Sequence, residues 1–454
     1  DQVLSHTSDK HPWFRESRLS RTNSRADWYV WSDPKRDGTP PNNWPSVFGG
    51  RAWEWNPSRG QYYFHNFLIE QPDLNFHNPD VQDAVLDVLR FWLERGVDGF
   101  RLDTVNYYFH DRQLRNNPAA RLPRHLPYAV NPYDMQEHKY GKSQPENVVF
   151  LKRVRKLLDQ FPGTTTVGEV GDSHVGLKLM GEYTSGGDKL HMAYTFDMLG
   201  KEFTAEHFRG KMKRFFDANE DGWPCWSFSN HDVDRHVSRW AKYAVDQKAL
   251  ARQAVAMLIA LKGSICIYQG EELGLPQADI LFEELTDPPG IRFWAEYKGR
   301  DGERTPIPWD TSDSPNGFSN VKPWLPVKYE HSVLNVTTQN GDPDSTLQFY
   351  RQALAFRRAH TALVDGDIDF FKVNEPVLAF RRNNETESLV CLYNLSPDSV
   401  RINVVGEAEI ALMQAAERKK DKLTLGPNGF AFLSETAGQK LQVAYAGRPK
   451  RKPQ

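Results

Sequence analysis

Cysteine, charge imbalance and long apolar runs are all scarce in this sequence. The three cysteines, Cys225, Cys266 and Cys391, lie in apolar strand-like segments, which predicts buried free thiols rather than a disulfide framework. The net charge is -2, so no strong field favours nucleic acid or a membrane surface as a partner. No apolar run approaches the roughly 18 residues that a membrane-spanning helix needs. What remains is a chain of 454 residues, long enough for more than one domain and a large core.

Residues 96–104, with the sequence GVDGFRLDT, are the stretch around which the rest of the chain is organised. They are predicted to form a short buried strand with a carboxylate at its C-terminal end. Because side chains alternate along a strand, Arg101 and Asp103 share one face and Phe100 and Leu102 share the other. An Arg and an Asp together at a strand end are costly to bury. They indicate either a structural ion pair or a functional site.

A helix is predicted just before this strand. Asn78 is a capping residue and Pro79 suits the first helical position, while Gly96 ends the run. The predicted apolar face consists of Val81, Val85, Val88, Leu89 and Trp92.

Further strands are predicted to end in polar side chains. The segment 164–169 ends in Glu169, and the segment 225–232 ends in His231 and Asp232. Polar residues gathered at the C-terminal ends of successive parallel strands are what a (β/α)8 barrel uses for its active site.

With these segments in view, the chain resembles the α-amylase superfamily, glycoside hydrolase family 13. A motif beginning with Gln at 71–75 is similar to the α-glucosidase and oligo-1,6-glucosidase branch, and two later motifs also fit that branch. Seven motifs follow one another in family order over most of the chain: DQVLSH at 1–6, QPDLN at 71–75, GFRLD at 99–103, VGE at 167–169, SNHD at 229–232, YQGEE at 268–272 and KGRDGERTP at 298–306.

The resemblance implies a (β/α)8 TIM barrel with a loop-inserted subdomain and a C-terminal antiparallel β-sandwich. The chain would start at barrel strand three, which makes it part of the catalytic domain. The expected divisions are a barrel over 1–6 and 71–362, subdomain B over 7–70, a β domain over 363–445 and a disordered tail over 446–454. Within the barrel, helices are expected over 148–158, 249–262 and 347–360, strands over 189–199 and 264–269, and an insertion over 274–339.

The same resemblance implies a retaining α-glucosidase. Asp103 would be the nucleophile and Glu169 the acid/base. Asp232 would bind sugar hydroxyls and favour the distorted ring. Arg101 would orient Asp103 and keep it ionised.

Further residues are expected around the substrate. His6, His231 and Arg300 would bind hydroxyls of the non-reducing glucose, and Arg304 is a less favoured alternative to Arg300. Local packing alone would also account for the two candidate wall residues, Phe48 and Phe67. Thr104 would favour α-1,4 over α-1,6 bonds, because its hydroxyl can hydrogen-bond the neighbouring sugar.

No metal and no cofactor are expected. The family pattern usually has a calcium-associated Asn where this chain has Ser5, and no dense acidic cluster stands nearby. The expected partner is a small oligosaccharide or α-glucoside, without nucleic acid or a visible membrane segment, and the expected location is the cytoplasm. The sequence does not indicate an oligomeric state.

Other functions stay open on the same scaffold. A sucrose-active isomerase or transglucosylase would differ only in the acceptor that meets the intermediate. A non-catalytic homologue associated with amino-acid transporters, or an inactive fragment, is a third possibility.

Overall fold

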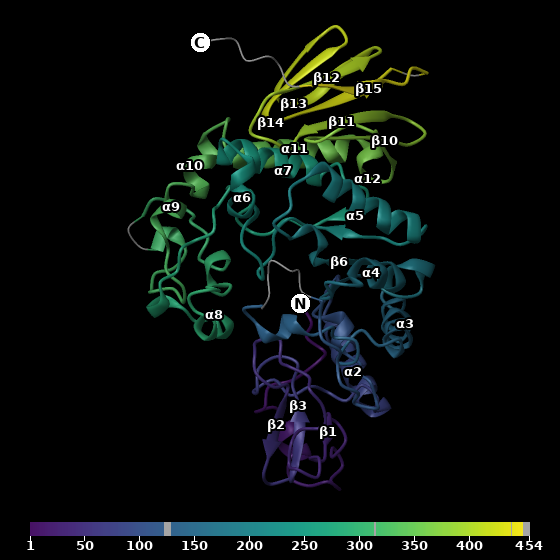
Figure 1. Cartoon of the computed structure of the whole chain (residues 1–454), viewed down its shortest axis with the longest axis vertical. Coiled ribbons are helices and arrows are strands. Elements are labelled where there is room, and N and C mark those ends of the chain that lie inside the picture. The colour runs from purple at the N-terminus through teal and green to yellow at the C-terminus, as the bar shows by residue number, and fades with distance from the viewer. Residues whose placement is uncertain (122–128, 313–314, 437, 448–454) are drawn as a thin grey trace. The chain divides into compact units, whose positions relative to one another are not determined.

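The computed structural model describes residues 1–121, 129–312, 315–436 and 438–447 (Figure 1). The chain forms two compact units. Unit 1 consists of Asp1–Phe196, Ala218–Trp223 and Pro288–Gly299. Unit 2 consists of Asp197–Asp217, Pro224–Asp287 and Arg300–Gln454.

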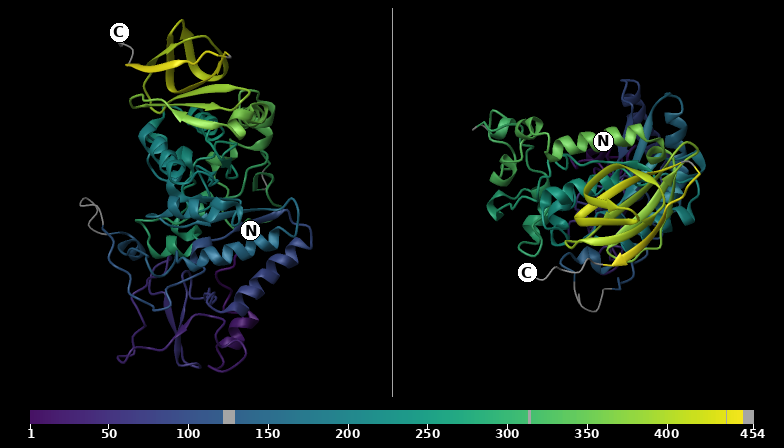
Figure 2. Two further views of the ribbon diagram at one scale, coloured as in Figure 1. Left: turned by 90° about the vertical axis from the view of Figure 1, so that its right-hand side faces the viewer. Right: turned by 90° about the horizontal axis from the view of Figure 1, so that it is seen from above.

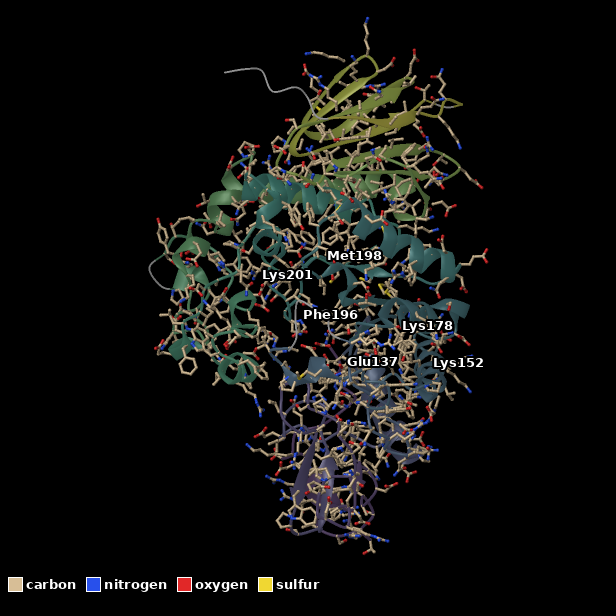
Figure 3. All side chains as sticks on the ribbon, viewed as in Figure 1. Glu137, Lys152, Lys178, Phe196, Met198 and Lys201 are labelled. Carbon is tan, nitrogen blue, oxygen red and sulfur yellow. The ribbon has the colours of Figure 1, made fainter. Side chains whose placement is uncertain are left out.

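The centre of unit 1 is a parallel sheet of barrel type. Gln2 lies beside the first strand in a parallel bridge to Leu102, and its N–H donates to the Arg101 carbonyl at 2.8 Å. The parallel order is β4-β5-β6, with helix α2 before β4 and helices α3 and α4 between the strands. Their bounds are β4 Gly99–Leu102, β5 Thr165–Val170, β6 Met192–Thr195, α2 Pro79–Leu93, α3 Glu146–Leu158 and α4 Gly176–Thr184. A single 3-10 turn, whose Phe196 and Met198 are labelled in Figure 3, follows β6.

Glycine is required at the start of β4. Gly99 has φ +146°, and a Cβ there would lie 1.9 Å from the Thr165 carbonyl oxygen. Only glycine lets β4 and β5 approach to pairing distance at this point.

Helix α2 begins as the sequence predicts, with the Asn78 side chain accepting from the Asp80 N–H. The predicted apolar face was wrong at Trp92, which is 43% exposed. The buried stripe is Val81, Val85, Leu89 and Leu93, spaced four residues apart, so Leu93 occupies the last inward position.

The segment predicted as subdomain B, residues 7–70, carries a small antiparallel sheet within unit 1. Its three strands run in the order β1-β3-β2, and their inner face packs on Val30, Trp44 and Ala52. The elements are α1 Pro12–Ser17, β1 Trp31–Ser32, β2 Trp53–Asn56 and β3 Gln61–Phe64, shown in purple in Figure 1.

Unit 2 contains two more parallel strands and the helices that flank them. β7 and β8 pair in parallel but are shorter than predicted, and the expected insertion carries short helices. The elements are α5 Ala205–Ala218, β7 Cys225–Trp226, α6 His236–Arg239, α7 Gln247–Leu258, β8 Ser264–Ile265, α9 Tyr329–Ser332, α10 Val336–Gly341, α11 Thr346–Ala359 and α12 Thr361–Val364; α8, Pro288–Arg292, belongs to unit 1.

An antiparallel sheet ends unit 2. Its order is β15-β12-β14-β11-β10-β9, and β13 pairs with β14. Register shifts in the long β13–β14 hairpin curl the sheet over an apolar core, as Figure 2 shows in green and yellow. The strands are β9 Asp367–Phe370, β10 Val377–Asn383, β11 Ser388–Asn394, β12 Val400–Val405, β13 Ala408–Lys419, β14 Lys422–Glu435 and β15 Gln442–Gly447. Of the expected tail 446–454, the first two residues lie in β15 and the rest lie outside the described residues.

The sheet is tied to helix α7 by polar contacts. The Gln253 side chain donates to the Asn394 and Gly429 carbonyls at 2.8 and 3.2 Å. In return, the Tyr393 hydroxyl donates to the Ala256 carbonyl at 3.1 Å, and the buried Arg382 donates to the Ala260 carbonyl at 2.7 Å.

All three cysteines are free thiols, as predicted. The prediction that all are buried was wrong for Cys266, which lies one residue beyond the end of β8 and is exposed. In the described part of the chain, no helix is long and apolar enough to cross a membrane.

Candidate active site

Two carboxylates of unit 1 meet on one guanidinium. Asp103 follows β4 directly, and Glu169 lies in the last part of β5. Arg101 Nη1 lies 2.5 Å from Asp103 Oδ1, and Arg101 Nη2 lies 2.7 Å from Glu169 Oε2. Burial alone would lower the pKa of Arg101, but Glu169, Tyr194 and Asp103 raise it overall, so the side chain stays a cation. The shared face predicted from strand alternation is therefore present, and it gathers a second carboxylate from the next strand.

Tyr194 is a further member of this cluster that the sequence did not suggest. Glu169 and Tyr194 are direct partners in the β5–β6 ladder. The Tyr194 hydroxyl donates to Glu169 Oε1 at 2.8 Å and accepts from Arg101 Nη2 at 2.9 Å. Burial and then the Glu169 carboxylate raise the pKa of Tyr194, so the hydroxyl keeps its proton and acts as a donor.

Thr104 adopts an unusual backbone conformation directly after Asp103. Its φ and ψ are 41° and 49°, the left-handed region that β-branched residues rarely enter. This turn points the Thr104 N–H at Glu169 Oε2, 3.1 Å away. The Thr104 hydroxyl lies 3.4 Å from both Asp103 Oδ2 and Ser5 Oγ, so its contacts inside the protein are long. Strained residues of this kind cluster at functional sites.

His6 lies beside the same strand end, in a bridge to Asp73. Its Nε2 is 3.0 Å from Gln71 Nε2, and its Nδ1 is 2.9 Å from Ser5 Oγ. Because Gln71 can only donate there, the proton of the neutral ring is assigned to Nδ1. Burial lowers the pKa of His6 to about 4, against the opposing effect of Asp103.

Of the two predicted wall residues, Phe67 stands next to His6 and Phe48 stands next to Phe67. The Phe67 ring centroid is 5.4 Å from that of His6 and 5.6 Å from that of Phe48. Tyr107, at the end of the 3-10 turn after Asp103, stacks on the other side of Phe67 at 5.5 Å. His6, Phe48 and Phe67 thus form one contiguous aromatic wall within unit 1.

Unit 2 holds the third predicted carboxylate in a separate network. Asp232 Oδ1 lies 2.9 Å from Arg300 Nη1 and 3.0 Å from Arg304 Nη2, and Asp232 Oδ2 lies 3.3 Å from His231 Nε2. The sequence analysis favoured Arg300 over Arg304 as the sugar-binding residue, but both guanidinium groups contact Asp232 at nearly the same distance. Arg304 also donates to the His231 carbonyl at 2.7 Å.

Asp287 is the residue that orients Arg300. Its carboxylate accepts from Arg300 Nη2 at 2.7 Å and from the Arg300 N–H at 2.9 Å. Burial opposes the charge of Arg300, but Asp287 and Asp232 raise its pKa overall. No local sequence signal marked Asp287, because it stands 13 residues before its partner in a loop.

Ser5, which stands where the family pattern usually has a calcium-associated Asn, contacts other side chains of the protein. Its buried hydroxyl lies beside His6 and Thr104. Over the residues that the structure describes, no group of three or more His, Cys, Asp or Glu side chains could hold a metal ion.

The comparison with protein families decides the identity of this scaffold. The model of the α-amylase catalytic domain matches residues 1–366. The chain belongs to the α-amylase family. As an α-amylase family member it has the (β/α)8 fold class, with a C-terminal antiparallel β domain, that the motifs predict, and it is a glycoside hydrolase of the α-glucosidase branch.

Relatives of this α-amylase family chain support the branch. A probable alpha-glucosidase of Rhizobium meliloti (strain 1021) is 55% identical over 403 residues, covering 88% of this chain and 73% of that protein. The oligo-1,6-glucosidase of Heyndrickxia coagulans is 34% identical over 437 residues, covering 88% and 76%. Among solved structures, an alpha-glucosyl transfer enzyme, XgtA, has a TM-score of 0.92 and 48% identity, covering 96% of this chain and 82% of that one. The trehalulose synthase MutB from Pseudomonas mesoacidophila MX-45 has a TM-score of 0.81 and 28% identity, covering 95% and 82%.

Proposed function

We propose that this protein is a retaining α-glucosidase that acts on the non-reducing end of short α-glucosides, prefers maltose-type α-1,4 bonds and can transfer the glucosyl group. The observation that carries the proposal is the Arg101 guanidinium shared by Asp103 and Glu169. It holds two carboxyl groups side by side, as a retaining glycosidase requires of its nucleophile and its acid/base.

The first step forms a bond between Asp103 and the anomeric carbon. The bond from that carbon to the leaving oxygen breaks, and Glu169 gives the leaving oxygen its proton. Arg101 orients Asp103, since its Nη1 contacts the Asp103 carboxylate directly. Thr104 follows Asp103 in the chain, and its hydroxyl is assigned to the sugar on the leaving-group side.

The second step returns Glu169 to the role of base. An acceptor hydroxyl gives its proton to Glu169 and attacks the anomeric carbon, and the bond to Asp103 breaks. Arg101, Tyr194 and the Thr104 N–H all donate to Glu169, and such donors favour the ionised form of a carboxyl group. The ionised form is the one that can accept the proton of water or of a sugar hydroxyl in this step.

The remaining residues are assigned to substrate binding. Asp232 accepts hydrogen bonds from hydroxyls of the glucose, and Arg300 and Arg304 hold its carboxylate in place. His231, with a side chain 43% exposed, offers its ring to a neighbouring hydroxyl. Phe48 and Phe67 give the sugar an apolar wall. His6 binds a hydroxyl only by exchanging one of its present partners.

Release assays on maltose, isomaltose, sucrose and a chromogenic α-glucoside test the function. Proton NMR should show α-glucose as the first product, because two successive inversions at the anomeric carbon retain its α configuration. Glu169→Gln should abolish activity on maltose but spare the first step on the activated aryl glucoside. Asp87→Asn, an exposed change on α2, serves as the control.

Three results would count against the proposal. β-Glucose as the first product would indicate inversion. An equal loss of activity on all substrates in Glu169→Gln would show that Glu169 is not the acid. Isomeric disaccharides as the main products from sucrose would favour a sucrose isomerase, a candidate supported by the likeness to trehalulose synthase.

A further inference from the structure

Subdomain B contains a cavity that the proposed mechanism does not use. Its volume is about 470 Å³, within the range of small-molecule sites. It lies beside the β2–β3 hairpin and helix α8, with Arg292 of α8 as part of its wall. All of these elements belong to unit 1.

An exposed aromatic face stands at this cavity. Trp55 is 41% exposed, and its neighbours in β2 are Glu54 and Asn56. Tyr62, its cross-strand partner, packs edge-on against it at 5.1 Å, which fixes the indole orientation. An indole face held open to solvent suits the apolar C–H face of a sugar ring, because it offers area with little conformational freedom left to lose.

The charged side chains of the cavity are of both signs. Arg51 and Glu54 each line it, and neither side chain forms an ion pair or hydrogen bond with another described residue. Arg292 and Glu70 add a second charge of each sign. A free cation or anion would meet repulsion from half of this set. A sugar hydroxyl both donates and accepts, so it can use a guanidinium and a carboxylate together.

His65 gives an independent sign of a missing polar partner. It is 1% exposed and lines the cavity, with Nδ1 3.0 Å from the Phe67 carbonyl. Burial lowers the pKa of His65, so the ring is neutral and Nδ1 is the donor to that carbonyl. Among the described residues Nε2 has no hydrogen-bond partner. A buried acceptor of this kind is satisfied by a ligand hydroxyl or by a water that the ligand holds.

Two features set the expected size of the ligand. A neighbouring cavity of about 390 Å³ shares Gly50, Arg51 and Trp53 with the first. The first cavity is also lined by Phe67, whose ring packs beside His6, and by Phe48, whose ring packs beside Phe67. Phe67 is therefore common to the cavity and to the aromatic wall beside His6, so a ligand longer than one ring can contact both.

We propose that this cavity binds the distal units of a neutral α-oligosaccharide, with Trp55 as the stacking platform and Arg51, Glu54 and His65 as hydroxyl partners. The proposal rests on the proposed function for its substrate class. It makes subdomain B a determinant of chain-length preference.

Binding without turnover tests it first. Maltotetraose is titrated calorimetrically into Asp103→Asn protein, with and without Trp55→Ala. Losing a stacked ring is expected to weaken binding about five- to tenfold. Glu54→Gln, which keeps the shape of the side chain, is expected to weaken it about threefold. Trp92→Ala is the matched control, since Trp92 is equally exposed on α2 and does not line the cavity.

Turnover gives a second readout in proteins with Asp103 intact. For Trp55→Ala, the ratio of kcat/KM on maltotetraose to kcat/KM on the aryl glucoside should fall about five- to tenfold through KM. Unchanged affinity and ratio in both Trp55→Ala and Glu54→Gln would overturn the proposal and leave the α-glucosidase assignment standing. Loss of maltotetraose binding in Trp55→Ala, in a protein that cleaves no α-glucoside, would support the site and refute the assigned activity.

Discussion

Replacing Tyr194 by Phe tests whether the hydroxyl between Arg101 and Glu169 contributes to catalysis. Phe keeps the ring and nearly all of the volume, so the change removes two hydrogen bonds and little packing. Both bonds have a charged partner, at 2.8 Å to Glu169 and at 2.9 Å to Arg101. Hydrogen bonds to charged groups contribute about 1.5–3 kcal/mol each.

The expected magnitude is smaller than the sum of both bonds. Arg101 and Glu169 also contact each other directly at 2.7 Å, and Glu169 still accepts from the Thr104 N–H, so both keep partners in the variant. We expect kcat/KM to fall about 10- to 100-fold, which corresponds to about 1.4–2.8 kcal/mol. Because the ionised form of Glu169 loses a donor, the alkaline limb of the pH profile should move to higher pH.

The assay is kcat and KM on an aryl α-glucoside and on maltose across the acid and neutral range, with urea unfolding in parallel. Tyr393→Phe is the control, because its hydroxyl donates to a neutral carbonyl, that of Ala256. It should cost about 1 kcal/mol of stability and leave kcat/KM within about twofold. If Tyr194→Phe also stays within about twofold, or loses activity without any shift of the pH profile, the hydroxyl does not act on Glu169.

Four further predictions follow from the site and its support. Thr104→Val should reduce the kcat/KM preference for maltose over isomaltose by several-fold to about tenfold, because both residues are β-branched in the same left-handed turn and only the hydroxyl is lost; an unchanged ratio would remove the linkage role. Asp287→Asn should lower kcat and cost about 3 kcal/mol in urea unfolding, since a buried ion pair loses one charge; wild-type values for both would contradict its orienting role. Gly99→Ala should cost about 3 kcal/mol through the clash with the next strand; a loss below about 1 kcal/mol would show that the strands can separate there. His6 has a lowered pKa, so its neutral form contributes stability that is complete above about pH 6.5 and is lost as the pH falls toward about 4; the stability of His6→Asn should fall less steeply over this range, and equal slopes would refute the assignment.

Strand ends were predictable from the sequence because their signal is local. The period of two puts Arg101 and Asp103 on one face, and the structure places them in contact. Glu169 was predicted in the same way and lies in the last part of β5, whereas Asp232 lies beyond the end of β7, which is shorter than predicted.

Their partners were not predictable from local patterns. Tyr194 reaches Glu169 only because of the β5–β6 register, and Asp287 reaches Arg300 only through the path of a loop. The left-handed turn at Thr104 was also missed, since a β-branched residue predicts extended backbone. Trp92 was misassigned because it is apolar and one residue away from the correct helical position.

The hydrogen bonds that join the α7 region to the C-terminal sheet decide where this enzyme can be truncated. The family match ends at residue 366, one residue before β9 begins. Yet the carbonyls of Ala256 and Ala260 take their side-chain donors from Tyr393 and Arg382, and the Gln253 amide depends on carbonyls beyond the same point. A truncation at the end of the catalytic-domain match would leave these groups without their hydrogen-bond partners. The end of the catalytic-domain match therefore differs from the boundary of cooperative folding, and only the second is a safe place for a stop codon or a fusion.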